Sequence, residues 1–201
     1  MKFHYMGKFD GDYEALPTRE HEPNYVPFKE PSAKKLPLII NAIALVIAIV
    51  LIIPVMVVSG EYIGGFIDSH GFLMFFAFWL AICLLTLVVI LPHEFLHGLC
   101  FKGDVYMYTN LSKGLCFVVG PELFSKSRFV LMSLLPNLVF GLIPYVIWII
   151  FPNLWYLGFW GAIGMSMGGG DYMNALNALV QMPKGAKTYL HGMNSFWVMP
   201  E

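Results

Sequence analysis

Long apolar segments constrain this chain more than any other feature of its sequence. The stretches 36–58 and 72–90 contain no charged residue. A helix of about 20 mainly apolar residues is long enough to cross the hydrocarbon core of a bilayer. Over the whole chain, 58% of the residues are hydrophobic and only 12% are charged, whereas a soluble domain has roughly 25% charged residues. The sequence therefore predicts an integral membrane protein.

Four helical spans are expected from the apolar segments, at about 36–58, 72–101, 129–151 and 154–180. The fourth span is interrupted by a single acidic residue, Asp171. We therefore predict an all-α polytopic membrane protein whose four-helix domain covers residues 36–182. The tail 183–201 follows this domain. The tail 1–35 precedes it and mixes six basic residues with six acidic ones and four prolines, so we expect mostly irregular structure there.

The lysines and arginines of the tails and loops alternate in number along the chain. The tail 1–35 has six, the loop 59–71 has none, the stretch 102–128 has four, the turn 152–153 has none and the tail 183–201 has two. Because basic residues gather on the cytoplasmic side, both termini and the middle loop are expected in the cytoplasm. The formal net charge of -1 gives no basic field for nucleic acid.

The middle loop, residues 102–127, has a different character from the other connections. Its runs 105–108 and 115–119 are rich in β-branched and aromatic residues, and a polar segment at 109–114 separates them. Two such runs around a polar turn are typical of a β-hairpin. We expect a short hairpin-like loop on the cytoplasmic side.

The motif His93-Glu94-Phe95-Leu96-His97 lies within the second expected span. Histidines four residues apart share one face of a helix, where two imidazoles can bind one zinc ion. Glu94 lies about 100° around the helix from His93, close enough to take a proton from water without binding the metal. An acidic residue at the centre of a membrane helix costs roughly 2.5 to 3.5 kcal/mol. The motif therefore indicates a functional site, and the alternative is that it marks the wet end of the helix.

Asp171 is the predicted third ligand, because catalytic zinc usually takes three protein ligands and leaves a position for water. His93 and Asp171 each precede the cytoplasmic end of their expected helix by about eight or nine residues, which places both roughly 12 Å deep at 1.5 Å per residue. A packing or proton-relay carboxylate is the alternative for Asp171. The rival ligand is Glu122, which we expect to be a solvated carboxylate at the cytoplasmic surface.

Two asparagines complete the predicted site. Asn137 follows Pro136 in the third expected span, and its amide can hold an extended substrate backbone or form an interhelical hydrogen bond. Asn174, one turn after Asp171, is expected to support the zinc ligands or to pack between helices. Pro92 removes one helical hydrogen bond, so a kink is expected just before His93.

The motifs at 93–97, 133–137 and 170–171, in three successive helices, resemble the catalytic core of site-2 proteases. The chain is more similar to a family of small bacterial membrane proteins called putative zincin peptidases, over roughly residues 72–200. The resemblance implies one role for each residue of the site: zinc ligands His93, His97 and Asp171, general base Glu94 and substrate clamp Asn137. It also implies a bacterial cytoplasmic membrane. Two features depart from site-2 proteases, since glycines precede Asp171 and Ser133 stands where glycine is usual.

The sequence thus predicts a zinc-dependent intramembrane endopeptidase that hydrolyses peptide bonds of membrane-associated protein or peptide substrates. Its expected partners are the lipid bilayer and such a substrate, with no nucleic acid and no oligomeric state implied. The alternative is a catalytically inactive metal-binding scaffold or sensor. Glu94 argues against it, because metal binding alone does not need that residue. A transporter is disfavoured, since one polar cluster on one side offers no path across the bilayer.

Overall fold

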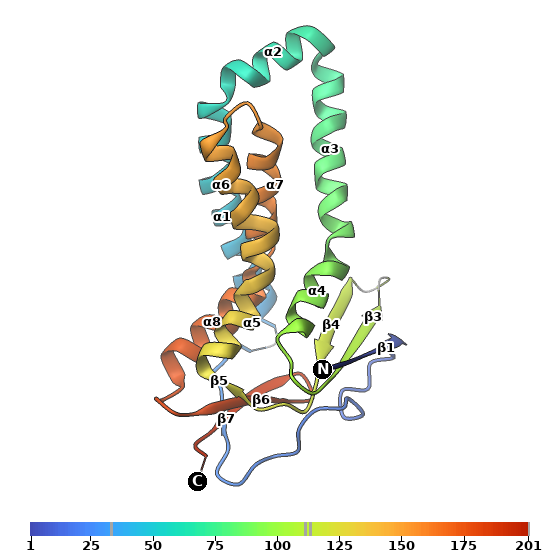
Figure 1. Cartoon of the computed structure of the whole chain (residues 1–201), viewed down its shortest axis with the longest axis vertical. Coiled ribbons are helices and arrows are strands. Elements are labelled where there is room, and N and C mark those ends of the chain that lie inside the picture. The colour runs from blue at the N-terminus through green and yellow to red at the C-terminus, as the bar shows by residue number, and fades with distance from the viewer. Residues whose placement is uncertain (33, 111, 113, 201) are drawn as a thin grey trace. The chain divides into compact units, whose positions relative to one another are not determined.

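The structure is a computed structural model that describes residues 1–32, 34–110, 112 and 114–200. Its elements divide between two compact units, and most of the helices and strands are labelled in Figure 1. Unit 1 combines residues 1–32, 91–135 and 171–200, and it contains the β-sheets. Unit 2 combines residues 34–90 and 136–170 and is helical.

Three helical stretches in the described part of the chain are long and apolar enough to cross a membrane: Leu36–Val58, Phe72–Leu99 and Lys126–Ile150. The predicted fourth span at 154–180 is not confirmed. That segment forms two separate helices, α7 (Trp155–Ser166) and α8 (Gly169–Gln181), of 12 and 13 residues. The reason is local, because glycine costs about 1 kcal/mol relative to alanine inside a helix and three glycines occupy positions 168–170.

The prediction of an all-α chain is wrong, because two β-sheets are present, with strand orders β1-β3-β4 and β2-β7-β6-β5. Both predicted tails contribute strands: β1 (Lys2–Lys8), β2 (Val26–Pro27), β6 (Lys187–His191) and β7 (Asn194–Val198). β1 runs parallel to β3 (Asp104–Asn110). The charged composition of the tail 1–35 concealed β1, although Phe9, directly after it, is 3% exposed and belongs to a hydrophobic cluster.

The predicted hairpin in the middle loop is confirmed. β3 pairs antiparallel with β4 (Leu115–Val119), from Tyr106 opposite Val119 to Asn110 opposite Leu115. Val105 and Val119 are almost completely buried. β4 ends the strand order on one side of this sheet, and β1 ends it on the other.

The second sheet of unit 1 is antiparallel and is built around the hairpin of β6 and β7. The short strands β5 (Phe124–Ser125) and β2 pair with the outer sides of this hairpin. The main core of unit 1 gathers buried side chains from several of its segments: Phe28, Phe101, Val105, Phe124, Phe129, Ala178, Met182 and Ala186.

Unit 2 contains the helices α1 (Leu36–Val58), α2 (Gly60–His70), α3 (Phe72–Val88), α6 (Ile143–Ile150) and α7, and the π-helical turn η2 (Leu138–Leu142). Residues 59–71, predicted as a loop, thus include a helix. Trp148 donates a hydrogen bond of 2.8 Å to Ser59 Oγ in the core of this unit. Gly161 lets α7 approach η2, because a Cβ atom there would lie 2.7 Å from the carbonyl oxygen of Gly141.

Two prolines interrupt helical hydrogen bonding next to the predicted site. Pro92 has no N–H and its ring clashes with the carbonyl four residues earlier, which belongs to Val88. α3 ends at Val88, and α4 (Ile90–Leu99) begins after Val89. The helix is therefore interrupted just before His93, at the place where the kink is expected. Pro136 lies inside α5 (Lys126–Asn137).

Candidate metal centre

His93 and His97 lie one turn apart on α4, and their Nε2 atoms are 3.2 Å apart. Glu94 belongs to the same cluster, in which the candidate ligand atoms of the three residues lie within 4.8 Å of one another. The four-residue spacing thus brings both imidazoles to one face of the helix, as the motif predicts.

Asp171 on α8 also belongs to this cluster. Asp171 and the histidine motif of α4 both lie in unit 1. Its Oδ2 lies 3.2 Å from Nε2 of His93, and its Oδ1 lies 3.3 Å from Nε2 of His97. Asp171 stands in the first turn of α8, where the helix dipole favours a negative charge. Two helices that are distant in sequence therefore bring one carboxylate to both histidines.

The spacing of these donor atoms fits a zinc ion. Zinc in proteins is usually tetrahedral, with bonds of about 2.0 to 2.2 Å to nitrogen and oxygen, which places neighbouring ligand atoms about 3.3 Å apart. The observed separations are 3.2, 3.2 and 3.3 Å. Two imidazoles and a carboxylate are also a donor set found in catalytic zinc sites. His93, His97 and Asp171 are thus the residues that would hold the metal.

The orientation of His97 is fixed by a backbone group of α5. Nδ1 of His97 lies 2.8 Å from the carbonyl oxygen of Met132. A carbonyl only accepts hydrogen bonds, so Nδ1 carries the proton and Nε2 keeps its lone pair for a metal. Met132 precedes Pro136 by four residues, and Pro136 has no N–H to donate to that carbonyl. A backbone acceptor has no side-chain signature, so the sequence does not predict the role of Met132. Pro136 is the signal that could have revealed it.

The three candidate ligands differ in exposure. The side chain of His93 is 22% exposed and that of Asp171 is 17% exposed, whereas that of His97 is 10% exposed. His97 is thus the most enclosed of the three side chains.

Strand β4 lies beside Glu94. The backbone of Val118 lies near the Glu94 carboxylate. Cys116, two residues earlier on this strand, is a free thiol, and its burial, together with the charge of Glu94, raises its pKa to about 11. Cys116 therefore stays protonated at neutral pH.

Glu122 has a structural environment of its own. Its carboxylate accepts hydrogen bonds from Arg128 at 2.6 Å and from the backbone N–H groups of Lys102 at 2.6 Å and Gly103 at 3.3 Å. The expectation of a solvated surface carboxylate is thus wrong, since the side chain is 16% exposed and ion-paired. Arg128 also donates to the carbonyl oxygen of Cys100 at 2.8 Å. The ion pair of Glu122 and Arg128 thus binds the backbone of residues 100–103, directly after α4.

The two predicted asparagines belong to different units. Asn137 belongs to unit 2, where it is 5% exposed and its side chain occupies the space that a Cβ atom on Gly168 would need. Asn174 is half-buried on α8, one turn after Asp171. Their roles as substrate clamp and as support for the ligands stay predictions.

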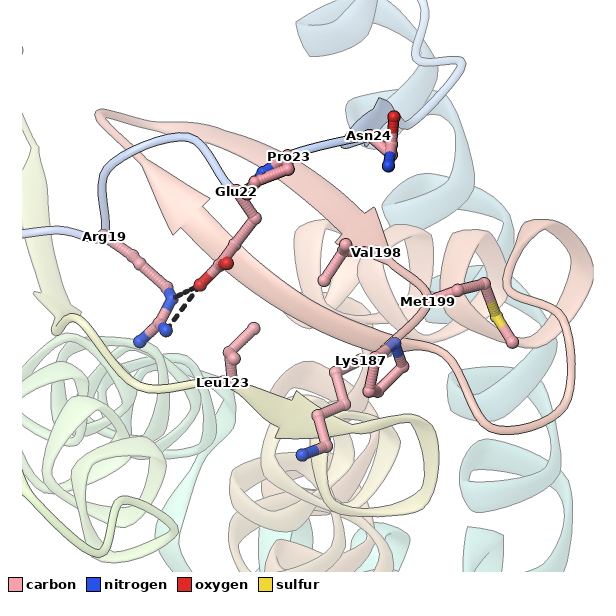
Figure 2. A pocket seen from close by; sticks show the side chains of 9 residues that line it. Arg19, Glu22, Pro23, Asn24, Leu123, Lys187, Val198 and Met199 are labelled. Atoms are coloured by element: carbon pink, nitrogen blue, oxygen red, sulfur yellow. Dashed lines mark hydrogen bonds and ion pairs between the residues drawn. The ribbon is translucent and has the colours of Figure 1, made fainter.

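A pocket of about 350 Å³ in unit 1 contains none of the predicted site residues. Figure 2 shows the side chains that line it, with Arg19 and Glu22 paired to each other. Arg19 also donates to the carbonyl oxygen of Pro121 at 3.2 Å. Because these charges are already satisfied within the protein, the histidine cluster is the stronger candidate for chemistry.

Residues 85–187 match a protein family described as "Putative zincin peptidase". The matched range is about half of the chain, and it includes the histidine motif, Asn137, Asp171 and Asn174. No curated protein and no solved structure matches the chain.

Proposed function

Because the chain belongs to the family described as "Putative zincin peptidase", we propose that it is a zinc-dependent endopeptidase that cleaves membrane-associated proteins in or beside their membrane segments. One observation carries this proposal: the side chains of His93, His97 and Asp171 converge with separations of 3.2 to 3.3 Å next to Glu94. Three ligands and an adjacent carboxylate are the minimum set for hydrolysis by a zincin.

Each residue of the cluster has a distinct task in this reaction. When bound, zinc would polarise the scissile carbonyl and make water acidic enough to react near neutral pH. Glu94 takes the proton of the attacking water and delivers it to the nitrogen of the departing amine. His97 is kept in the correct tautomer by the carbonyl of Met132, and Asp171 supplies the negative charge that two neutral imidazoles lack.

The placement of the motif supports a substrate in the membrane. His93, Glu94 and His97 lie inside the stretch Phe72–Leu99, which is long and apolar enough to span a bilayer. Near the end of such a helix, the cluster can reach peptide bonds at the membrane boundary that a soluble protease cannot. The arrangement proposed here is analogous to that of site-2 proteases, in a bacterial cytoplasmic membrane with both termini in the cytoplasm.

The test compares wild-type protein with Glu94→Gln, purified in detergent and also expressed in cells. Metal content is measured on the purified proteins, and new N-termini among membrane proteins are identified by N-terminal labelling in the cells. We expect both proteins to contain zinc and only the wild type to generate new N-termini. Loss of a general base alone should slow cleavage by about 10²- to 10⁴-fold.

One control variant makes this comparison decisive. His97→Ala should lose both the metal and the cleavage, because it removes a ligand. Equal metal content in wild type and Glu94→Gln, with no cleavage by either, would reject the peptidase and favour the inactive scaffold or sensor.

A further inference from the structure

Strand β1 packs against the helix turn that carries the metal-binding motif. The ring of Phe3 lies 5.3 Å from the ring of Phe95, measured between centroids. A Cβ atom on Gly98 would lie 2.9 Å from Cε2 of Phe3, so the absence of a side chain at position 98 makes room for this ring. Phe95 stands between Glu94 and His97, and Gly98 follows His97 directly. Phe3 therefore contacts the site turn itself.

Phe3 contacts the back of this turn. With 100° per residue, the direction of Phe95 and Gly98 lies roughly 150° around the helix from the direction of His93 and His97. A side chain that presses on the back of the helix determines how far the histidines reach toward Asp171. Glycine is unfavourable inside a helix, so Gly98 is explained better by this close approach than by helix formation.

β1 is held firmly enough to act as a support. It forms a parallel ladder with β3, and the backbone N–H of Lys2 donates to the carbonyl oxygen of Gly103 at 3.1 Å. His4 Nε2 lies 2.9 Å from Oδ1 of Asp104, and the ring of His4 stacks on Tyr106 at 4.9 Å. Phe3 is thus fixed by the sheet of β1, β3 and β4, and it contacts α4 at Phe95 and Gly98.

We propose that Phe3 is a positioning residue of the metal centre, through which strand β1 sets the place of the α4 turn relative to Asp171. β1 lies outside the matched range 85–187, so this support is a feature of the chain beyond the family match. The catalytic meaning of this role rests on the proposed function. Its test uses metal binding, which does not depend on cleavage.

The experiment measures zinc affinity by competition with a chromophoric chelator on the full-length purified protein, and the absorption spectrum of its cobalt(II) form. Phe3→Ala should weaken zinc binding by about 10- to 100-fold, as loss of a supporting contact around a metal site usually does, and should change the cobalt spectrum. Phe3→Leu keeps an apolar side chain of similar reach and should stay within about threefold of wild type. Tyr5→Ala is the matched control, because Tyr5 is an aromatic residue of the same strand that is 65% exposed.

The effect of Gly98→Ala on zinc affinity should depend on the residue at position 3. In the wild-type background the added methyl group meets the Phe3 ring and should weaken zinc binding. The Phe3→Ala and Phe3→Leu backgrounds both lack the Cε2 atom that the methyl group meets, so the same substitution should be neutral or favourable there. Such non-additivity is expected only of residues in contact. This comparison also decides the question if Phe3→Ala alone does not fold.

The proposal would be overturned if Phe3→Ala had the same zinc affinity and the same cobalt(II) spectrum as the wild type. Equal losses in Tyr5→Ala and Phe3→Ala would also overturn it, because they would indicate general damage to the sheet. An additive effect of Gly98→Ala in both backgrounds would have the same meaning. If zinc affinity depends on Phe3 in a protein that cleaves nothing, the positioning role holds and the peptidase proposal fails.

Discussion

Oδ2 of Asp171, in the first turn of α8, lies 3.2 Å from Nε2 of His93 on α4. We predict that Asp171→Ala lowers zinc affinity by more than about 100-fold, beyond what the loss of an outer supporting contact costs. The reason is that two neutral imidazoles remain without the anionic ligand. Chelator competition measures the affinity, and circular dichroism should show unchanged helix content, since α8 does not need this carboxylate to form.

The matched acidic control for this prediction is Glu122→Ala. Its carboxylate is bound by Arg128 and by backbone N–H groups, so its removal should leave zinc affinity within about threefold of wild type. If Glu122→Ala released the metal and Asp171→Ala kept it, the site built from α4 and α8 would be wrong. The similarity to site-2 proteases would then fail with it.

Glu122 should instead determine stability in acid. Burial alone would raise the pKa of Glu122, but the hydrogen bonds from Arg128, Lys102 and Gly103 outweigh it and hold the pKa below its ordinary value of 4.5. A carboxyl group with a lowered folded-state pKa stabilises the fold fully above its unfolded pKa, and this contribution is lost as the pH falls through the folded pKa.

The matching prediction concerns Glu122→Gln. At pH 7 this variant should lose about 1.5 to 3 kcal/mol of the free energy of unfolding, the usual value of hydrogen bonds to a charged group. The difference from wild type should shrink as the pH falls below about 4.5, because the wild-type carboxyl is then protonated as well. Thermal unfolding in detergent across this pH range measures it. A difference that grows in acid would contradict the assigned ion pair.

The sequence was sufficient for the features that depend on local spacing. The four-residue step between the histidines fixes their common face in any helix. The alternation of β-prone runs around 109–114 was enough to predict the hairpin of β3 and β4. Asp171 could be selected because an acidic residue within an apolar membrane segment is energetically costly and usually functional. The structure places it beside the histidines. Its role as a ligand stays a prediction.

Other features depend on partners that local sequence does not identify. β1 forms a strand because it pairs with β3. The local sequence of the charged tail 1–35 does not identify this partner strand. The separation of α7 from α8 is the outcome of a competition between an apolar run, which favours one long helix, and the glycines at 168–170, which weaken it. The carbonyl of Met132 became visible as an acceptor only when the fold brought His97 to it.

The orientation of the chain in the membrane can be tested by cysteine labelling from outside intact cells. In a background in which Cys83, Cys100 and Cys116 are replaced, Gly65→Cys should react with an impermeant reagent and Lys102→Cys should not. Both positions are exposed in the structure, so a lack of reaction reports the membrane side and not burial. Reaction of Lys102→Cys in intact cells would contradict the cytoplasmic placement of the middle loop, which rests on the alternation of basic residues.

The last prediction concerns how a peptide bond reaches the metal centre. Peptide bonds in a helical membrane segment are shielded by helical hydrogen bonds, and pairing with the edge of a sheet would present them in extended form. β4 ends its sheet on the side that no other described strand occupies, since β1 pairs with β3.

The free edge of β4 includes Val118, which lies near Glu94. In an antiparallel pair, alternate residues direct their backbone groups away from the partner strand. The carbonyl oxygen of Thr109 faces β1, where it accepts a hydrogen bond from the backbone N–H of Phe9 at 2.9 Å. Thr109 is paired with Cys116, so Cys116 and Val118 are the residues whose N–H and C=O groups point away from β3. We therefore expect an extended substrate to pair with these two residues.

Val118→Pro removes an N–H group that the β3 ladder does not use, so the hairpin should survive. We expect kcat/KM to fall at least about tenfold, mainly through a higher KM, because ground-state binding is lost, while zinc affinity stays unchanged. Val118→Ala keeps the N–H group and should retain nearly full activity. A fall in kcat alone would indicate that the Val118 backbone acts on Glu94 and not on the substrate. Unchanged turnover in Val118→Pro would reject strand pairing at this edge.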